Sequence, residues 1–190
     1  MTYSDDELFR FEKTIDGYTL AEYCQKENKE ITEIIIPLKY NDRFVVDIGA
    51  WAFENAEHLE SVKLPDSVRA ISRGAFSDAY QLERVNIPKG VTEIADFAFK
   101  NCFGLRHIEI PDGVVKIGQF GFADSSLKTV VLPKSLEFLG DCAFENGIYL
   151  ENVIFNSVPV FGRQVFKGCE HLPADITLMG LVNSYDITQP

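Results

Sequence analysis

A single repeat runs through most of this chain and limits the folds that the chain can adopt. Phenylalanine recurs at steps of 23, 23, 23, 22 and 22 residues, at Phe53, Phe76, Phe99, Phe122, Phe144 and Phe166. A leucine follows each of them, at Leu59, Leu82, Leu105, Leu127, Leu150 and Leu172. A unit of about 23 residues is too small to bury its own apolar face, whereas stacked units bury one continuous core. The repeat therefore predicts a solenoid, and we call each repeat a coil.

Four of the coils are predicted to contain a short β-strand that ends at a proline. In Leu59–Leu64 apolar and polar residues alternate, which is typical of a strand with one buried face. Pro65 follows, and proline lacks the N–H that would continue a strand ladder. A large apolar residue precedes a proline in three further coils, at Pro88, Pro111 and Pro133.

Beyond the proline, the chain is predicted to return along a second buried path. Aliphatic residues stand three and six positions after each proline, as Val91 and Ile94 do after Pro88. A small residue comes next in every coil: Gly49, Ser72, Ala95, Gly118, Gly140 and Gly162. This column indicates a corner at which the backbone turns or approaches a neighbouring coil. The phenylalanine rings are expected to stack from coil to coil as the spine of the core.

The segment from Leu82 to Leu105 shows the pattern Leu-x-x-Val-x-Ile-Pro-x-x-Val-x-x-Ile-x-x-x-Ala-Phe-x-x-Cys-x-x-Leu. This pattern resembles the BspA-type leucine-rich repeat, and the likeness extends from about Ile34 to Leu172. The resemblance implies a right-handed leucine-rich-repeat solenoid of a bacterial or protist protein. It also implies a family that includes cell-surface adhesins binding host matrix proteins.

The predicted architecture is a β-rich leucine-rich-repeat solenoid with parallel strands on one face and short irregular or helical turns on the other. Residues 1–33 form an N-terminal cap: Phe9–Glu12 and Tyr18–Leu20 alternate around the turn signal Asp16-Gly17, which predicts a β-hairpin. A polar loop or short helical turn follows. Residues 34–172 are the repeats, and residues 173–190 form a C-terminal cap with a closing strand over 176–179 and a polar tail.

Composition places the chain among soluble globular proteins, with 190 residues, 46% hydrophobic and 25% charged. The formal net charge of −11 repels a phosphate backbone, so nucleic acid is not expected as a partner. No stretch approaches the ~18 consecutive apolar residues of a membrane-spanning helix, and the acidic start lacks the pattern of a signal peptide. We therefore expect a cytoplasmic protein. A secreted or cell-surface location, implied by the resemblance, is the alternative.

Residue types that carry catalysis or bind metals do not fall into a known spacing. The three histidines lie in different coils without the His-x-x-x-His pattern: His58, His107 and His171. The four cysteines form no Cys-x-x-Cys pair: Cys24, Cys102, Cys142 and Cys169. Cys102 and Cys169 would lie ~14 Å apart at ~4.8 Å per coil, too far for a disulfide. We expect free thiols in a reducing compartment, no metal, no cofactor, no catalytic residue and hence no enzyme.

Two surfaces remain as candidate binding sites. If Val62 and Leu64 point inward, the alternate positions of the strands point outward and form two columns. Arg84, His107 and Glu109 form the polar centre of this face, and Val131 and Ile154 an exposed apolar end. The alternative is that these are ordinary solvated positions. The second surface holds Trp51, Phe97 and Phe120, which form either an exposed aromatic patch or a second row of core.

The function expected from these features is a non-catalytic protein–protein interaction module with an unidentified protein ligand. Weak self-association through the aromatic patch is a further possibility. The alternatives are a cell-surface adhesin fragment that binds host matrix protein and, from another class, a structural scaffold without a specific ligand.

Overall fold

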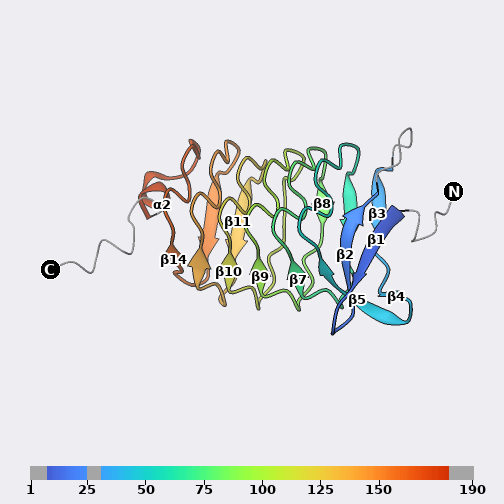
Figure 1. The fold of residues 1–190 in the computed structure, drawn as a ribbon. Helices are drawn as coiled ribbons and strands as arrows, with labels where there is room; N and C mark the ends of the chain where they lie inside the picture. The colour runs from blue at the N-terminus through green and yellow to red at the C-terminus, as the bar shows by residue number, and fades with distance from the viewer. Residues whose placement is uncertain (1–7, 25–30, 180–190) are drawn as a thin grey trace.

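The computed structural model describes residues 8–24 and 31–179, and these form a solenoid of coils lying side by side (Figure 1). The six phenylalanines of the repeat stack through the core with ring centroids 5.0 to 5.7 Å apart. Each of these rings is at most 1% exposed. Stacking removes a large aromatic surface from water in every coil. The predicted solenoid and its phenylalanine spine are therefore confirmed.

The coils contribute short parallel strands to two rows. The first row precedes the prolines and holds β3 (Glu33–Ile35), β6 (Ser61–Lys63), β8 (Arg84–Val85), β11 (Thr129–Leu132) and β13 (Asn152–Phe155). The second row lies on the return path and holds β5 (Arg43–Ile48), β7 (Ala70–Ile71), β9 (Glu93–Ile94), β10 (Lys116–Ile117), β12 (Phe138–Leu139) and β14 (Val160–Phe161). Strands were expected on one face only, so the second row is an addition that the structure provides. It is continuous, whereas the first row is divided into β3-β6-β8 and β11-β13.

The second row is held in register by one buried apolar side chain per coil. Ile94 lies opposite both Ile71 and Ile117 in the neighbouring strands, and all three are at most 1% exposed. A slip of one residue would turn these side chains to solvent, so the register is strongly specified. The residues that precede them form the outward column of the second row: Asp47, Ala70, Glu93, Lys116, Phe138 and Val160.

The third side of each coil is a run of turns that bonds to the next coil through its backbone. The Phe76 N–H donates to the Ala98 carbonyl at 2.8 Å, and the same link recurs along the stack. Two columns on this side have left-handed φ angles of 54° to 77°. The first is Trp51, Gly74, Phe97, Phe120, Cys142 and Gln164, and the second is Asn55, Asp78, Asn101, Asp124, Asn146 and Gly168. Asn, Asp and Gly tolerate this conformation best, so the second column is a turn signal that was not predicted.

The small-residue column lies where neighbouring coils approach most closely. A Cβ atom on Gly140 would lie 2.5 Å from the backbone nitrogen of Gln119. The Gly140 N–H donates to the Ile117 carbonyl at 2.7 Å, whereas the corresponding bond from Ala95 to Ile71 lengthens to 3.4 Å. Ser72, which also carries a Cβ atom at this corner, keeps a bond of 2.9 Å to the Ile48 carbonyl, so the bond between coils varies in length where the corner residue is not glycine. The corner inferred from the sequence is confirmed.

The N-terminal hairpin is confirmed, with β1 (Phe9–Lys13) antiparallel to β2 (Tyr18–Tyr23). The ring of Tyr23 stacks on Phe53 at 5.4 Å and so extends the phenylalanine spine by one ring. β2 pairs in parallel with β5, and β4 (Lys39–Tyr40) pairs antiparallel with the same strand. The hairpin therefore covers the first coil, as expected. The polar run at 25–30 lies outside the described residues.

The C-terminal cap differs from the prediction. Residues 174–179 form the helix α2 (Ala174–Met179), so the closing strand expected over 176–179 is wrong. Pro173 precedes the helix, where a residue without an N–H costs nothing because the first N–H groups of a helix have no partner inside it. The Thr177 N–H donates to the Pro173 carbonyl at 3.1 Å, and Ile176 packs against the core. The predicted tail at 180–190 lies outside the described residues.

Candidate functional site

The five strand-face candidates all lie on the outward side of the first row. Arg84 is on β8, Val131 on β11 and Ile154 on β13, while His107 and Glu109 lie in a segment that forms no strand. All five are exposed, with Val131 at 46% and Ile154 at 43%. Val131 and Ile154 are directly paired in the β11–β13 register. The structure therefore brings the apolar pair together, as the sequence suggested.

Arg84 forms ion pairs with Glu33 of an earlier coil and with Glu83 of its own coil. Its guanidinium lies 3.2 Å from the Glu33 carboxylate and 3.3 Å from that of Glu83. All three side chains are more than half exposed, and ion pairs of that kind contribute little to stability. Arg84 is thus able to exchange these partners for an acidic ligand group at small cost. Among the described residues no ion pair joins Arg84 to Glu109.

The segment 106–110, which carries His107 and Glu109, is unpaired in the first row. Within the described ranges no backbone hydrogen bond joins it to 84–88. A bond of 3.4 Å from the Lys128 N–H to the Arg106 carbonyl is its only such link to the next coil in those ranges. The side chains of Ile108 and Ile110 are nevertheless buried, so packing holds the segment in place. Apart from the Arg106 carbonyl, its backbone N–H and C=O groups form no hydrogen bond to a neighbouring strand within the described residues.

A groove of about 980 Å³ opens at this interruption. Its walls come mainly from residues 83–90 and 107–109, with Val62, Asp66, Arg69 and Pro111 completing the lining, and they include Arg84, His107 and Glu109. Three of the five strand-face candidates thus line one groove, whereas Val131 and Ile154 lie outside it. The lining carries both signs of charge, which suits a partner surface with its own mixture of polar groups.

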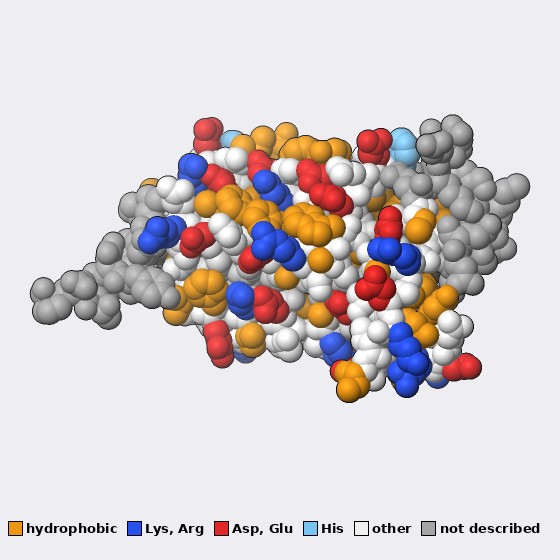
Figure 2. Space-filling view, in the orientation of Figure 1, with side chains coloured by type: hydrophobic (Ala, Val, Ile, Leu, Met, Phe, Trp, Pro, Cys, Tyr) orange, Lys and Arg blue, Asp and Glu red, His pale blue; other side chains and the backbone are white. Residues whose placement is uncertain are grey.

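The aromatic candidates form a row on the turn side. The ring of Phe97 stacks on Phe120 at 5.3 Å and lies 6.3 Å from that of Trp51. Phe97 and Phe120 are half-buried, and Trp51 is 40% exposed, so the row is neither a free patch nor a second core. Arg73 lies over the face of Phe97 at 4.9 Å, and Lys100 lies 5.4 Å from the ring of Phe120. Figure 2 shows hydrophobic side chains forming a band above β7, β9 and β10, with Lys and Arg side chains beside it.

Gly74 explains how Trp51 and Phe97 meet although they are two coils apart. Gly74 occupies the same column in the coil between them, and the Trp51 indole covers the place where its Cβ would stand. Any larger residue would collide with that ring. The indole therefore extends across the coil of Gly74. In the sequence, the only sign of this arrangement is a glycine in a column of large residues.

Sequence reasoning missed a second hydrophobic ridge, which lies four to five residues after the core phenylalanines. Tyr80 stacks on Phe103 at 5.5 Å, and both are exposed. Ile148 and Tyr149 are exposed at the equivalent place in a later coil. The coil that lies between these two pairs is one residue shorter from Phe122 to Leu127, and it has Ser126 at the ridge position. A column of large apolar residues at this offset was the available signal.

The three described thiols inside the coils are unreactive. Cys102 and Cys169 donate to the carbonyls of Phe76 and Phe144 at 3.2 and 3.1 Å. Burial raises the pKa of Cys169 and of Cys142 to about 11, and that of Cys102 further. All three are therefore protonated at neutral pH and poor nucleophiles. Cys24 is also a free thiol.

The described residues hold no group of three or more His, Cys, Asp or Glu side chains placed to bind a metal ion. In the same part of the chain no helix has the length and apolar character required to cross a bilayer.

The fold and its faces define a leucine-rich-repeat solenoid. The chain belongs to the family of the BspA type leucine rich repeat region, whose model matches residues 46–173 in six copies. The resemblance stated from the repeat pattern is thereby confirmed. The search of curated proteins gave no match.

The similar solved structures are bacterial leucine-rich-repeat proteins. The T. pallidum leucine rich repeat protein TpLRR has a TM-score of 0.78 and 27% identity, over 97% of this chain and 99% of that one. A leucine-rich repeat protein from Bacteroides ovatus has a TM-score of 0.75 and 29% identity, and this chain, matched over 86% of its length, spans 44% of that one. A leucine rich cell surface protein from Faecalibacterium prausnitzii, at 22% identity and a TM-score of 0.50, shares the fold over 84% of this chain and 56% of its own.

Proposed function

We propose that this chain is a non-catalytic module that binds a protein partner in the groove of the first strand row. The observation that carries the proposal is the segment 106–110, which lines one groove with Arg84 through His107 and Glu109 and forms no backbone hydrogen bond to 84–88 within the described residues. A partner held there would combine backbone hydrogen bonds, which give affinity, with side-chain contacts that give specificity.

The experiment uses three forms of the tagged chain: the wild type, a groove variant and a control variant. Each is used to capture proteins from extracts and surface fractions of the source organism. The groove variant is Arg84→Ala/His107→Ala/Glu109→Ala. The matched control removes the same residue types elsewhere, in Arg163→Ala/His58→Ala/Glu170→Ala. A protein bound by the wild type and the control but lost with the groove variant supports the proposal. Equal capture by all three forms would contradict it.

The aromatic row is a second candidate surface, for self-association. Trp51 is 40% exposed, and the Lys100 ammonium lies 5.8 Å from Phe97 as well as near Phe120. Half-exposed aromatic rings beside cations are typical of the centre of protein interfaces. The test is given among the predictions below.

We place the protein in the cytoplasm, which the four free cysteines support because a reducing compartment keeps thiols unpaired. The alternative is a cell-surface adhesin that binds host matrix protein, as the family resemblance implies. Purified matrix proteins included in the capture experiment distinguish the two, because only an adhesin binds them through the groove. A structural scaffold without a ligand predicts that no partner is captured by any form.

A further inference from the structure

A second cavity lies at the N-terminal end of the second strand row. It has a volume of about 730 Å³ and lies between the turn of the β1–β2 hairpin, the β4–β5 hairpin and the next coil. Leu38, Phe44, Val46 and Ala70 supply an apolar lining, and Asp47 supplies a carboxylate. The cavity therefore combines an apolar wall with a negative charge.

Asp47 is held in place by hydroxyl groups but lacks a cation. Its Oδ1 accepts a hydrogen bond from the Ser72 hydroxyl at 3.0 Å and its Oδ2 one from Thr19 at 3.3 Å. No Lys, Arg or His of the described residues forms an ion pair with it. Burial raises the pKa of this carboxyl, and the two hydroxyl bonds offset only part of that effect. A bound cation would compensate the half-buried charge.

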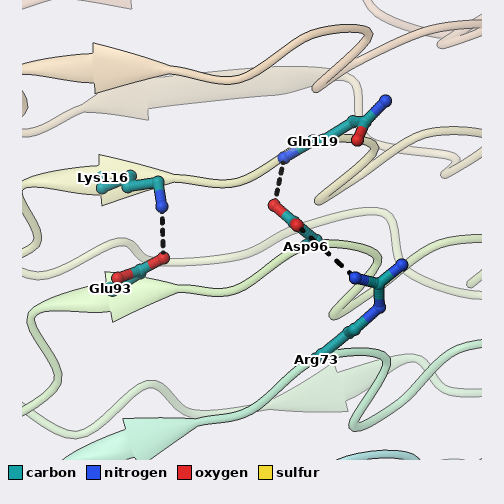
Figure 3. Close-up of polar contacts among 5 residues, drawn as sticks. All are labelled: Arg73, Glu93, Asp96, Lys116 and Gln119. Carbon is teal, nitrogen blue, oxygen red and sulfur yellow. Dashed lines mark hydrogen bonds and ion pairs between the residues drawn. The ribbon is translucent and has the colours of Figure 1, made fainter.

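The outward column of the second row shows what occupies the equivalent place further along the solenoid. Glu93 stands in that column, and Lys116 of the next coil lies opposite it in register. The Lys116 ammonium contacts the Glu93 carboxylate at 2.7 Å (Figure 3). Opposite Asp47 the next coil has Ala70. The first coil thus carries the acidic half of this pair and has a cavity where the lysine side chain would lie.

The other charged groups of the lining leave that place open to a cation. Asp16 and Asp66 add two carboxylates that form no ion pair within the described part of the chain. The Arg69 guanidinium donates instead to the carbonyls of Asp66 and Val68 and lies against Gly90 of the next coil. The Lys39 ammonium lies 4.9 Å from the ring of Phe44, but Lys39 does not line the cavity.

We propose that this cavity binds a lysine side chain of the partner protein, with the ammonium on Asp47 and the aliphatic stem against Phe44 and Val46. A lysine stem buries readily along apolar surface while its ammonium meets a carboxylate. Asp66 and Arg69 line both this cavity and the groove of the first row, so one partner is able to reach both. That the lysine belongs to the partner protein rests on the proposed function. The site for an ammonium group on Asp47 does not depend on it.

The test is a titration of the ¹⁵N-labelled chain, followed by amide chemical shifts, with N-acetyl-lysine N-methylamide. The control probe is the norleucine analogue, which keeps the stem but lacks the charge. We expect saturable shifts at Gly17, Asp47, Ser67 and Ala70 with the lysine probe, in the range of about 1–10 mM for one such contact. The norleucine probe should give none. Absence of shifts with lysine, or equal binding of norleucine, would overturn the inference.

Three variants keep the result independent of folding defects, because two of them change the same residue and are expected to have opposite effects. Ala70→Lys supplies an internal ammonium in the geometry of Lys116 and Glu93, so it should abolish probe binding, while Ala70→Ser, whose side chain is too short to fill the cavity, should retain it. Asp47→Asn should weaken binding about tenfold. Each variant is first checked for a native amide spectrum. Unaltered probe binding by Ala70→Lys would refute the assignment of the cavity.

Two further arms separate this inference from the groove proposal. Free butylammonium should bind no more tightly than the lysine probe; tenfold tighter binding would identify a small amine rather than a protein side chain as the occupant. The groove variant Arg84→Ala/His107→Ala/Glu109→Ala should bind the lysine probe normally. If that variant no longer captures the partner and the wild type shows no shifts with the lysine probe, the cation site is refuted and the groove proposal stands. If the groove variant still captures the partner and the lysine probe binds at Asp47, the groove proposal is refuted and the cation site stands.

Discussion

The side-chain amide of Asn101 donates a hydrogen bond of 2.7 Å to the carboxylate of Asp78, its equivalent in the preceding coil. Both residues have left-handed φ angles, so their side chains stand one above the other. The carboxylate also accepts bonds from the hydroxyls of Ser77 and Tyr80. Burial alone would raise the pKa of Asp78, but these hydrogen bonds and the charge of Lys100 outweigh it and lower the pKa. Asp124 and Asn146 repeat the pair two coils later.

This lowered pKa gives the first prediction. A carboxyl whose pKa is lower in the folded state stabilises the fold above its ordinary pKa of 3.8 and loses that contribution as the pH falls through the folded value. Asp78→Asn should therefore be less stable than the wild type at pH 7, by a margin that shrinks below pH 3.8. Urea unfolding at a series of pH values measures the margin. A margin that stays constant down to pH 2 would contradict the assignment, and the exposed Asp112→Asn is the control at pH 7.

The phenylalanine spine gives the second prediction. Phe99→Ala should lower the free energy of unfolding by about 3–5 kcal/mol, because it removes a fully buried ring between Phe76 and Phe122 and leaves a cavity. The matched control is Phe103→Ala, where the ring is 53% exposed, and it should cost less than about 1.5 kcal/mol. Denaturant unfolding compares the two. Equal costs would mean that the spine is not the core.

The aromatic row gives the third prediction. Phe97→Ser/Phe120→Ser should destabilise the fold by less than Phe99→Ala per ring, because both rings are only half-buried. It should also reduce self-association, measured by sedimentation velocity over a range of concentrations. Tyr80→Ser/Phe103→Ser, on the other ridge, serves as the matched control. If wild type and both variants sediment as the same monomer at every concentration, the row is not an interface.

The corner between coils gives the fourth prediction. Gly140→Ala should destabilise the fold by about 1–3 kcal/mol, because its Cβ would press on the backbone of Gln119. The bond from Gly140 to Ile117 should lengthen from 2.7 Å toward the 2.9 Å found at Ser72 or the 3.4 Å found at Ala95, so the amide at position 140 should exchange faster with solvent. Ala95→Gly is the reciprocal control and should slow exchange at position 95. Unchanged exchange in both variants would argue against close approach at this corner.

Repetition is the reason that the fold was predictable from one sequence. Phe76, Phe99 and Phe122 face the same environment, so each coil tests the interpretation of its neighbours. The ends have no such check. Residues 174–179 alternate in hydrophobicity as a strand does, and the helix there depends on Pro173 and on packing of Ile176 against the core. Local pattern alone does not contain that contact.

The candidate site was predictable only in part, for a similar reason. Alternation in the strands placed Arg84, His107 and Glu109 outward, and the structure agrees. The groove between them depends on the missing ladder at 106–110, and nothing in the residues themselves distinguishes that segment from its paired neighbours. The cavity at Asp47 likewise depends on how the hairpins meet the first coil, which is a relation between segments outside the repeat.

The interruption of the first row makes the stiffness of the solenoid depend on direction. The second row and the turn side bond each coil to the next through their backbones, whereas 84–88 and 106–110 are held together by side-chain packing alone. A bend that spreads the first row here breaks no backbone hydrogen bond, while the opposite bend strains the bonds of the other two sides. The molecule is thus most compliant in the one direction that widens the groove, and a partner that wedges it open works against little elastic resistance.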